Sequence, residues 1–254
     1  GYVEPSKVLI REKITIDIQN AICSCIDRLI SKIGYDLIRK IGCWVWTSYL
    51  KKRENDCADI FFITDYIENS EIEWFRKLDM VEAVIESLCE NSEIFGGYWG
   101  RYSIIESFVE DLNREFKRNN FAYRVVDNII IEIVNEEEIK TIEQALEDNA
   151  DNIQTHISQA LRLCSDRDNP DYRNSIKESI SAVEAYCREK TDSETLGDAL
   201  KKLKNAGLKI PMVLSTAFEK LYAYTNQSTT GIRHALMEDT YMPTYAEAVF
   251  MVVS

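Results

Sequence analysis

Two histidines occur in the chain, His156 and His234, and the second stands directly beside Arg233. An arginine can hold a phosphate group and stabilise negative charge that develops on it. A histidine titrates near neutral pH, so it can take up or give off a proton. Cleavage of RNA by its own 2′-hydroxyl group needs these two functions and no metal ion. Adjacent arginine and histidine are common, however, and chemistry alone favours a surface or helix-capping role for the pair.

Other types of active site lack their sequence signatures. With two histidines, neither a Ser-His-Asp triad nor a histidine-rich metal site is supported. Gly96 and Gly97, followed by Gly100, lack the Gly-Lys-Ser/Thr of a phosphate-binding loop, so they predict a plain turn. Glu136–Glu138 suit the first turn of a helix, where acidic side chains offset the helix dipole. The sequence therefore predicts no metal and no cofactor.

The composition is that of a folded, acidic protein. The 254 residues are 45% hydrophobic and carry a formal net charge of -13. This charge excludes bulk electrostatic binding of nucleic acid, so any RNA contact must come from a local cluster, a dimer groove or a partner. With 9 glycines and 4 prolines the chain has few helix breakers, which favours long helices.

The cysteines and hydrophobic runs indicate a cytoplasmic protein. No cysteine pair has the C-x-x-C spacing, so we expect reduced thiols. No signal peptide and no apolar run of membrane-spanning length is visible. The chain lacks an initiator Met and stops within a helical pattern, so we expect the native protein to be longer. The seven cysteines are Cys23, Cys25, Cys43, Cys57, Cys89, Cys164 and Cys187.

Apolar residues spaced by three and four predict amphipathic helices in the first half of the chain. These helices are expected at about 14–33, 35–50, 74–89 and 104–119, and Asp56–Asn69 could form a shorter one. Gly34 is expected to end the first helix. Residues 91–101 form the loosest stretch of the chain.

A hairpin is expected where the spacing changes. Two runs rich in β-branched and aromatic residues, Phe121–Val126 and Ile129–Ile133, are separated by Asp127 and Asn128. Two turn-forming residues between such runs predict a two-residue hairpin loop. The hairpin is the most natural divide in the chain, so we expect a helical domain at 1–135 and a helical bundle at 136–254.

Helical spacing returns after the hairpin, with Asn135 as the expected first cap. Helices are expected at about 136–148, 151–164, 194–205 and 211–224, and a last one follows Pro243. Asp168-Asn169-Pro170 predicts the start of a long helix that runs to about Lys190, with Pro170 in its first turn. The apolar stripe of that helix consists of Ile176, Ile180, Val183, Tyr186 and Cys187. The fold is thus expected to be mainly α.

Several segments resemble HEPN-like domains in AbiJ-type abortive infection proteins, which defend bacteria against phage. They are Asn169–Ala185, Thr195–Leu200, Gly231–Ala235 leading into Pro243, and Ala246–Met251. The upstream part, including Phe121–Val126 and the Glu-rich helix start, is similar to the AbiJ N-terminal domain that precedes it. Together these segments cover most of the chain.

The resemblance implies a helical bundle that dimerises and, in active family members, a metal-independent endoribonuclease. The family signature is an arginine, a polar residue and a histidine a few positions later. Arg233 matches the arginine and His234 the polar position. The later histidine is missing, and the positions where it should fall hold Met237, Glu238 and Asp239.

The resemblance also sets the expected roles. Glu184 matches an acidic residue near such sites, although it could be a surface carboxylate or pair with Arg233. If catalysis is retained, His234 must act as the base, helped by Glu238. If it is lost, the chain is a degenerate module for sensing, regulation or dimerisation. The expected partners are RNA, single-stranded or tRNA, a second copy, and a phage-derived trigger or antitoxin, with no membrane. His156 is expected to be a packed or capping residue.

Overall fold

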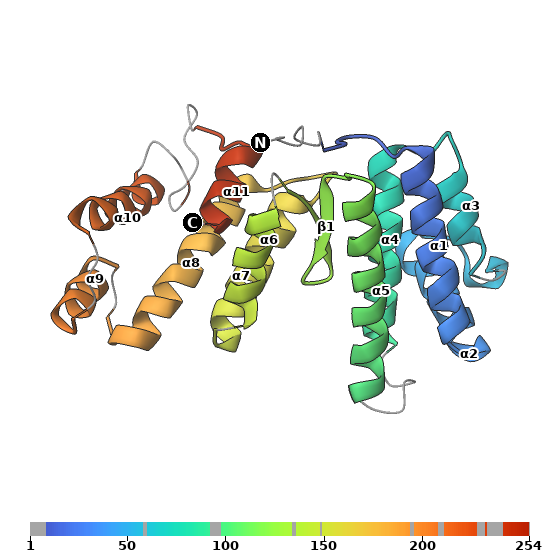
Figure 1. Cartoon of the computed structure of the whole chain (residues 1–254), viewed down its shortest axis with the longest axis horizontal. Helices are drawn as coiled ribbons and strands as arrows, with labels where there is room; N and C mark the ends of the chain where they lie inside the picture. The colour runs from blue at the N-terminus through green and yellow to red at the C-terminus, as the bar shows by residue number, and fades with distance from the viewer. Residues whose placement is uncertain are drawn as a thin grey trace, which may run out of the picture. The chain divides into compact units, whose positions relative to one another are not determined.

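The computed structural model describes residues 9–57, 60–91, 98–133, 136–147, 149–193, 196–207, 211–227, 232 and 241–253. The chain divides into two compact units, Gly1–Val134 and Asn135–Ser254. Within the described ranges, helices dominate both units and the strands form a single two-stranded sheet (Figure 1). The expectation of a mainly α fold with one hairpin is confirmed.

The first unit is built mostly from helices at the expected positions. Its elements are α1 (Ile16–Lys32), α2 (Tyr35–Trp44), a π-helical turn (Val45–Tyr49), a 3-10 turn (Glu54–Asp56), α3 (Phe62–Glu68), α4 (Trp74–Glu90), α5 (Tyr98–Arg118), β1 (Tyr123–Val126) and β2 (Ile129–Glu132).

Three local expectations for the first unit need correction. Gly34 does not end α1, which stops at Lys32; it is the N-cap of α2 instead. The second helix becomes π-helical over Val45–Tyr49. Gly100 lies within α5 and not in a turn, whereas Gly96 and Gly97 lie outside the described residues.

A continuous apolar core holds the first unit together. The buried side chains of α1 recur at three- and four-residue steps, so they form one stripe along the helix. That stripe packs with buried residues of α3, α4, α5 and the hairpin. The largest fully buried side chains include Phe116 at the end of α5 and Phe121 before β1, whose rings meet edge to face at 5.1 Å.

The hairpin follows from its two-residue loop. Asp127 and Asn128 both have positive φ angles, 49° and 64°. Such a pair matches the right-handed twist of the flanking strands, and Asp and Asn tolerate the left-handed region better than most residues. The register pairs Val126 with Ile129 and Tyr123 with Glu132, as the sequence predicts for strands joined by this loop.

Side chains from neighbouring helices satisfy both edges of the hairpin. The Asn113 side chain of α5 donates to the Val125 carbonyl at 2.8 Å and accepts from the Val125 amide at 2.7 Å. The Glu82 carboxylate of α4 accepts from the Ile130 amide. Because Val125 and Ile130 are each 1% exposed, these bonds take the place of water. The isolated hairpin, marginal by itself, is thereby fixed to the helices.

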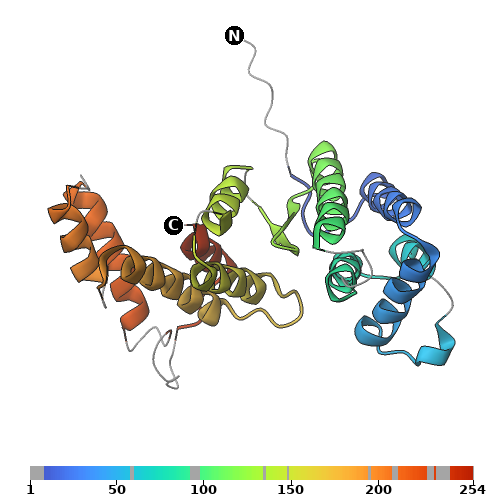
Figure 2. The same cartoon turned by 90° about the horizontal axis from the view of Figure 1, so that it is seen from below.

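The second unit is organised around one long helix. Its elements are α6 (Glu136–Glu147), α7 (Asp151–Ser165), α8 (Tyr172–Thr191), α9 (Leu196–Asn205), α10 (Met212–Asn226) and α11 (Tyr245–Val253). Helix α8 packs against α7, α9, α10 and α11, and α6 packs against α7 and α11. Helices α9 and α10 lie side by side near the C-terminal end of α8 (Figure 2).

The start of α8 differs from the expectation. Asp171 is its N-cap and accepts a hydrogen bond from the Asn174 amide at 2.9 Å. The helix therefore begins at Tyr172, and Pro170 precedes the cap instead of lying in the first turn. The reason is that Asp171 satisfies an amide group of the first turn directly. The expected cap Asn135 lies outside the described residues.

The apolar stripe of α8 is divided between core and surface. Ile176, Ile180 and Cys187 are buried, but Val183 and Tyr186 are 39% and 42% exposed. A helix with two large exposed apolar side chains in its middle offers a surface to another group.

The edge contacts of the hairpin predict a stability effect. Asn113→Leu keeps the size of the side chain but leaves both backbone groups of Val125 buried without a partner. We expect the free energy of unfolding of the first unit to fall by about 1–3 kcal/mol. Urea unfolding followed by tryptophan fluorescence measures this, because Trp44, Trp46, Trp74 and Trp99 all lie in the first unit.

A matched control is Asn20→Leu on the exposed face of α1. Within the described residues the Asn20 side chain makes no hydrogen bond. The bond from the Ser24 hydroxyl goes to the backbone carbonyl of Asn20, which the substitution keeps. We expect a change within about 0.5 kcal/mol. An equal loss in both variants would show that the Asn113 bonds do not hold the hairpin.

Candidate functional site

The expected catalytic residues fall in two places. Arg233, His234 and Glu238 lie outside the described residues. Glu184 lies on α8, in the third quarter of the helix. The described residues nearest in sequence to the Arg-His pair are Ile232 on one side and Tyr241 on the other.

Ile232 fixes the chain immediately before Arg233. Its side chain is 1% exposed and belongs to a cluster that includes Ile176 and Ile180 of α8. Ala248 and Met251 of α11 complete the buried part of this cluster, together with Cys164 of α7. Burial of an isoleucine contributes about 2 kcal/mol, so the backbone at position 232 is anchored on α8.

Tyr241, the first described residue after the Arg-His pair, is hydrogen-bonded to α11. Its hydroxyl donates to the Glu247 carboxylate of α11 at 2.7 and 2.8 Å. The same carboxylate accepts from the Thr244 amide at 2.8 Å, while the Thr244 hydroxyl oxygen accepts from the Glu247 amide at 3.4 Å. This reciprocal arrangement is a capping box at the start of α11. The hydrogen bonds from Tyr241 and Thr244 lower the pKa of Glu247, so the carboxylate stays ionised at neutral pH.

Glu184 is engaged by a tyrosine of the neighbouring helix. The Tyr222 hydroxyl of α10 donates to Glu184 Oε1 at 2.8 Å. The Tyr222 ring packs against the cluster that contains Ile232 and also against the cluster of Cys187, Ala199 and Leu200. Burial, followed by the charge of Glu184, raises the pKa of the Cys187 thiol.

The structure therefore brings Glu184 and the anchor of the Arg233 segment to one region of the second unit. Glu184 is half-buried, and the ring of its partner Tyr222 packs on the same cluster as Ile232. A carboxyl group in this position can orient a cation. Tyr222 was not identified from the sequence, because nothing local marks a contact between residues 38 positions apart.

His156 lies in a different environment from this region. Its Nδ1 is 2.7 Å from Glu178 Oε2, which joins α7 to α8. Glu178 is also 3.6 Å from Lys177 Nζ. Glu178 and Glu184 are six residues apart on α8, which places them about 120° apart around the helix axis. The structure thus does not bring His156 to Glu184. The contact of His156 with Glu178 instead links α7 to α8.

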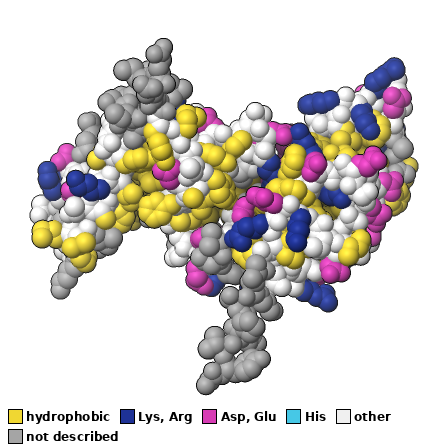
Figure 3. Space-filling view, turned by 90° about the horizontal axis from the view of Figure 1, so that it is seen from above, with side chains coloured by type: hydrophobic (Ala, Val, Ile, Leu, Met, Phe, Trp, Pro, Cys, Tyr) yellow, Lys and Arg dark blue, Asp and Glu magenta, His cyan; other side chains and the backbone are white. Residues whose placement is uncertain are grey.

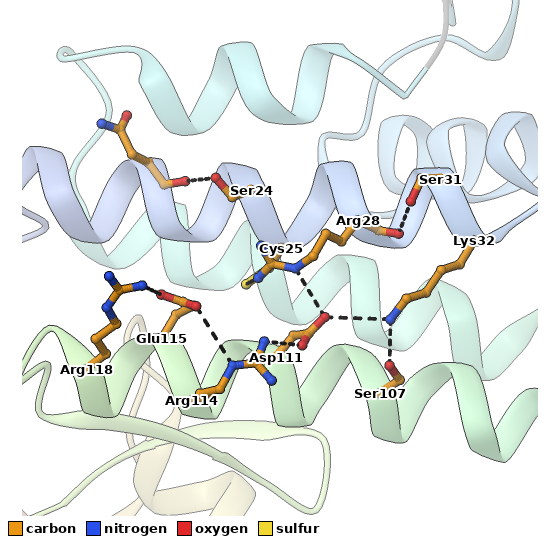
Figure 4. Close-up of polar contacts among 11 residues, drawn as sticks. Ser24, Cys25, Arg28, Ser31, Lys32, Ser107, Asp111, Arg114, Glu115 and Arg118 are labelled. Atoms are coloured by element: carbon orange, nitrogen blue, oxygen red, sulfur yellow. Dashed lines mark hydrogen bonds and ion pairs between the residues drawn. The ribbon is translucent and has the colours of Figure 1, made fainter.

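The first unit contains its own charged cluster, on the side where α1 faces α5 (Figure 4). Asp111 is 8% exposed and accepts from Arg28 at 3.3 Å and from Arg114, with Lys32 at 3.7 Å. Although burial acts to raise the pKa of Asp111, the bonds from Arg114 and Arg28 outweigh it and the pKa is lowered. A carboxylate held in this way joins helices and is a poor proton donor.

The buried thiols are also unsuited to nucleophilic chemistry. Burial raises the pKa of Cys23, Cys25 and Cys164 to about 11. Because the thiolate is the reactive form, these three groups are inert at neutral pH. All seven cysteines lie within described ranges, and none of them is in a disulfide bond in this structure.

No cluster of three or more His, Cys, Asp and Glu side chains is positioned to hold a metal ion in the described part of the chain. Among the described helices, none combines the length and apolar character that crossing a bilayer requires.

An apolar cavity lies between four helices of the second unit. Its volume is about 230 Å³. The lining includes Thr141 and Ile142 of α6, Ile157 of α7, Val183 and Tyr186 of α8, and Met251 of α11. Figure 3 shows hydrophobic side chains gathered over the helices of this unit. The exposed part of the α8 stripe is thus continuous with a hollow, and Met251 also belongs to the cluster that anchors Ile232.

Comparison with known proteins identifies the first part of the chain. The family model described as AbiJ N-terminal domain 4 matches residues 1–148. The match covers the first unit and α6, and it ends before α7. No curated protein and no solved structure matches the chain.

The capping box predicts a pH-dependent stability. Glu247→Gln removes the charge that accepts from Tyr241 and Thr244, so we expect the variant to unfold more easily at neutral pH. Since the folded pKa of Glu247 lies below its ordinary value of 4.5, this contribution is present above that value and is lost as pH falls through the folded pKa. Urea unfolding followed by circular dichroism, in pH steps, measures it.

The control is Glu219→Gln on the exposed face of α10. Within the described residues the Glu219 side chain has no hydrogen bond or ion pair. Its difference from the wild type should stay small and not follow the Glu247 profile. If Glu247→Gln is as stable as the wild type at neutral pH, the box does not secure α11.

Proposed function

Because the chain belongs to the AbiJ N-terminal domain 4 family, we propose that it is an abortive-infection protein of anti-phage defence whose second unit cleaves RNA. In this proposal residues 1–135 are the AbiJ-like domain and residues 136–254 are a HEPN-like bundle. The bundle is a metal-independent endoribonuclease that works as a dimer in the cytoplasm. The family membership supports the defence context.

One observation supports the nuclease most directly. The chain before Arg233 is anchored through Ile232 on α8, while the partner of Glu184, Tyr222, packs on the same cluster. A site that moves protons needs its groups held on rigid elements, because small errors of position cost catalysis heavily. Ile232 and Tyr241, the described residues on either side of the Arg-His pair in sequence, are both held by contacts within the second unit.

The roles follow from the chemistry of the side chains. Arg233 binds the scissile phosphate and stabilises its developing charge. His234 takes the proton of the 2′-hydroxyl, which then attacks the phosphorus and expels the 5′-oxygen. Glu238 supports the protonated imidazole. Glu184 orients Arg233 from α8. The products carry a 2′,3′-cyclic phosphate and a free 5′-hydroxyl.

A dimer reconciles this activity with an acidic chain. In a twofold dimer the two Arg-His pairs face one cleft, and one histidine acts as base while that of the second copy protonates the leaving oxygen. The apolar surface of Val183 and Tyr186, with the cavity beside it, supports association of this unit with a second copy. Met251 connects that surface to the cluster of Ile232.

A second candidate is a degenerate HEPN module that senses or regulates. It is favoured by the residues where the later histidine is missing, Met237, Glu238 and Asp239. It is also favoured by the bond from Tyr222, which already occupies Glu184. In either case the first unit serves as the part that receives a phage-derived trigger or an antitoxin.

RNA cleavage is the direct test. The purified protein is incubated with cellular RNA in excess chelator, beside Arg233→Ala and His234→Ala. We expect cleavage by the wild type that leaves 2′,3′-cyclic phosphate ends, and a loss of at least about 100-fold in each variant, because removal of a general base or of a charge-stabilising group costs about this much.

The control is His156→Ala, which removes the other histidine. His156 bonds to Glu178 between α7 and α8, so its loss should leave the cleavage rate within about twofold once folding is checked. Cleavage that needs a divalent metal, or that survives in His234→Ala, would contradict the nuclease proposal. A folded dimer without cleavage would favour the degenerate module.

The dimer surface is tested with two valines. Val183→Lys places a charge on the half-exposed α8 surface, and we expect it to shift the protein from dimer to monomer, because a charge inside an apolar interface is costly. Val213→Lys on α10 makes the same change at a side chain that is 80% exposed and should leave the dimer intact. Light scattering during size-exclusion chromatography gives the molar mass of each variant. If Val183→Lys and Val213→Lys have the same oligomeric state, the dimer interface lies elsewhere.

A further inference from the structure

Two cysteines of the first unit lie in direct contact. Cys43 is in the last turn of α2, and Cys57 follows the 3-10 turn Glu54–Asp56. Their Sγ atoms are 2.7 Å apart, although the residues are 14 positions apart in sequence. This distance is inside the ordinary contact of two sulfur atoms. Both side chains are half-buried, so a small solute can reach the pair.

The segment between the two cysteines is folded back on itself by other contacts. Trp46 Nε1 donates to the Arg53 carbonyl at 2.9 Å, and the Lys52 amide donates to the Trp46 carbonyl at 3.0 Å. The Lys52 ammonium group lies 4.2 Å from the centre of the Trp46 ring, which packs edge to face on Phe62. These contacts bring the sulfur atoms together without a covalent bond between them.

Little movement would therefore join the two sulfur atoms. A disulfide bond is about 2.05 Å long, so Cys43 and Cys57 would need to approach by only about 0.7 Å. The exposed run Lys51–Arg53 lies in the same connection and favours the approach of an anionic reagent. The buried thiols of Cys23, Cys25 and Cys164 do not compete, because burial holds them protonated.

We propose that Cys43 and Cys57 form a reversible dithiol–disulfide pair that exchanges with small disulfides such as glutathione disulfide. One thiolate attacks a glutathione sulfur, forms a mixed disulfide and releases one glutathione. The second thiolate attacks the protein sulfur of that mixed disulfide, closes the bond between Cys43 and Cys57, and releases the second glutathione. The two cysteines lose two protons and two electrons, and two glutathione thiols are formed.

The bond locks the connection between α2 and α3. It closes the loop that contains the π-helical turn and the 3-10 turn, and it lowers the conformational entropy of the unfolded chain. Oxidation therefore stabilises the first unit against unfolding, and reduction removes this stabilisation. In a reducing compartment such a bond is transient and suits redox sensing. The pair lies wholly within the first unit, so the inference does not depend on nuclease activity.

Mass spectrometry of the whole protein tests the pair. The protein is equilibrated in glutathione buffers of increasing glutathione disulfide content, trapped by alkylation and digested. In a sample that is neither alkylated nor digested, we expect the intact mass to fall by two hydrogen atoms. In the digest we expect a cross-linked peptide that contains Cys43 and Cys57, and dithiothreitol should fully reverse both changes. We also expect tryptophan fluorescence to report a higher melting temperature for the oxidised form.

Cys43→Ser and Cys57→Ser should each lose both the cross-link and the rise in melting temperature. Cys89→Ser, a matched change at another half-buried cysteine, should keep both. The proposal is overturned if the folded wild type stays reduced in excess glutathione disulfide. It is equally overturned if Cys43 and Cys57 end as two separate glutathione adducts, or if the bond forms between other cysteines. The wild-type measurement decides without any variant.

Discussion

The packing of Ile232 against α8 is the constraint on which the second unit depends. Ile232 follows a run of polar residues from Asn226 to Gly231 in the sequence, and its side chain shares a cluster with Ile176 and Ile180 of α8. The same cluster receives α11 through Ala248 and Met251 and the ring of Tyr222 from α10. A single apolar cluster therefore links α7, α8, α10 and α11.

In the first unit, several polar side chains join one element of structure to another. Asp111 connects α1 with α5, Asn113 and Glu82 bond to the edges of the hairpin, and Arg11 donates to Glu132. Side chains whose hydrogen bonds are satisfied in this way are poorly suited to acid–base catalysis.

Local signals predicted the parts of the fold that depend on neighbouring residues. Asp127 and Asn128 specify the hairpin because two consecutive left-handed residues are compatible with few other structures. Helix α8 begins later than the sequence predicted. Asp168 and Asp171 are both suitable N-caps, and the sequence alone does not show that Asp171 is the one used. Contacts between distant residues leave no such signal. The bond from Tyr222 to Glu184 and the approach of Cys43 to Cys57 depend on how helices and connections pack, which periodicity does not encode.

Helix α6 connects the family domain to the candidate site. The family match extends through α6, yet this helix packs with α7 and α11 in the second unit. Thr141 and Ile142 of α6 line the same cavity as Met251 of α11, and Met251 shares a cluster with Ile232. Packed interiors resist continuous deformation, so a displacement of α6 has to be accommodated by α11 and its neighbours. Packed side chains within the second unit thus connect α6, the last helix covered by the family match, with the cluster that contains Ile232.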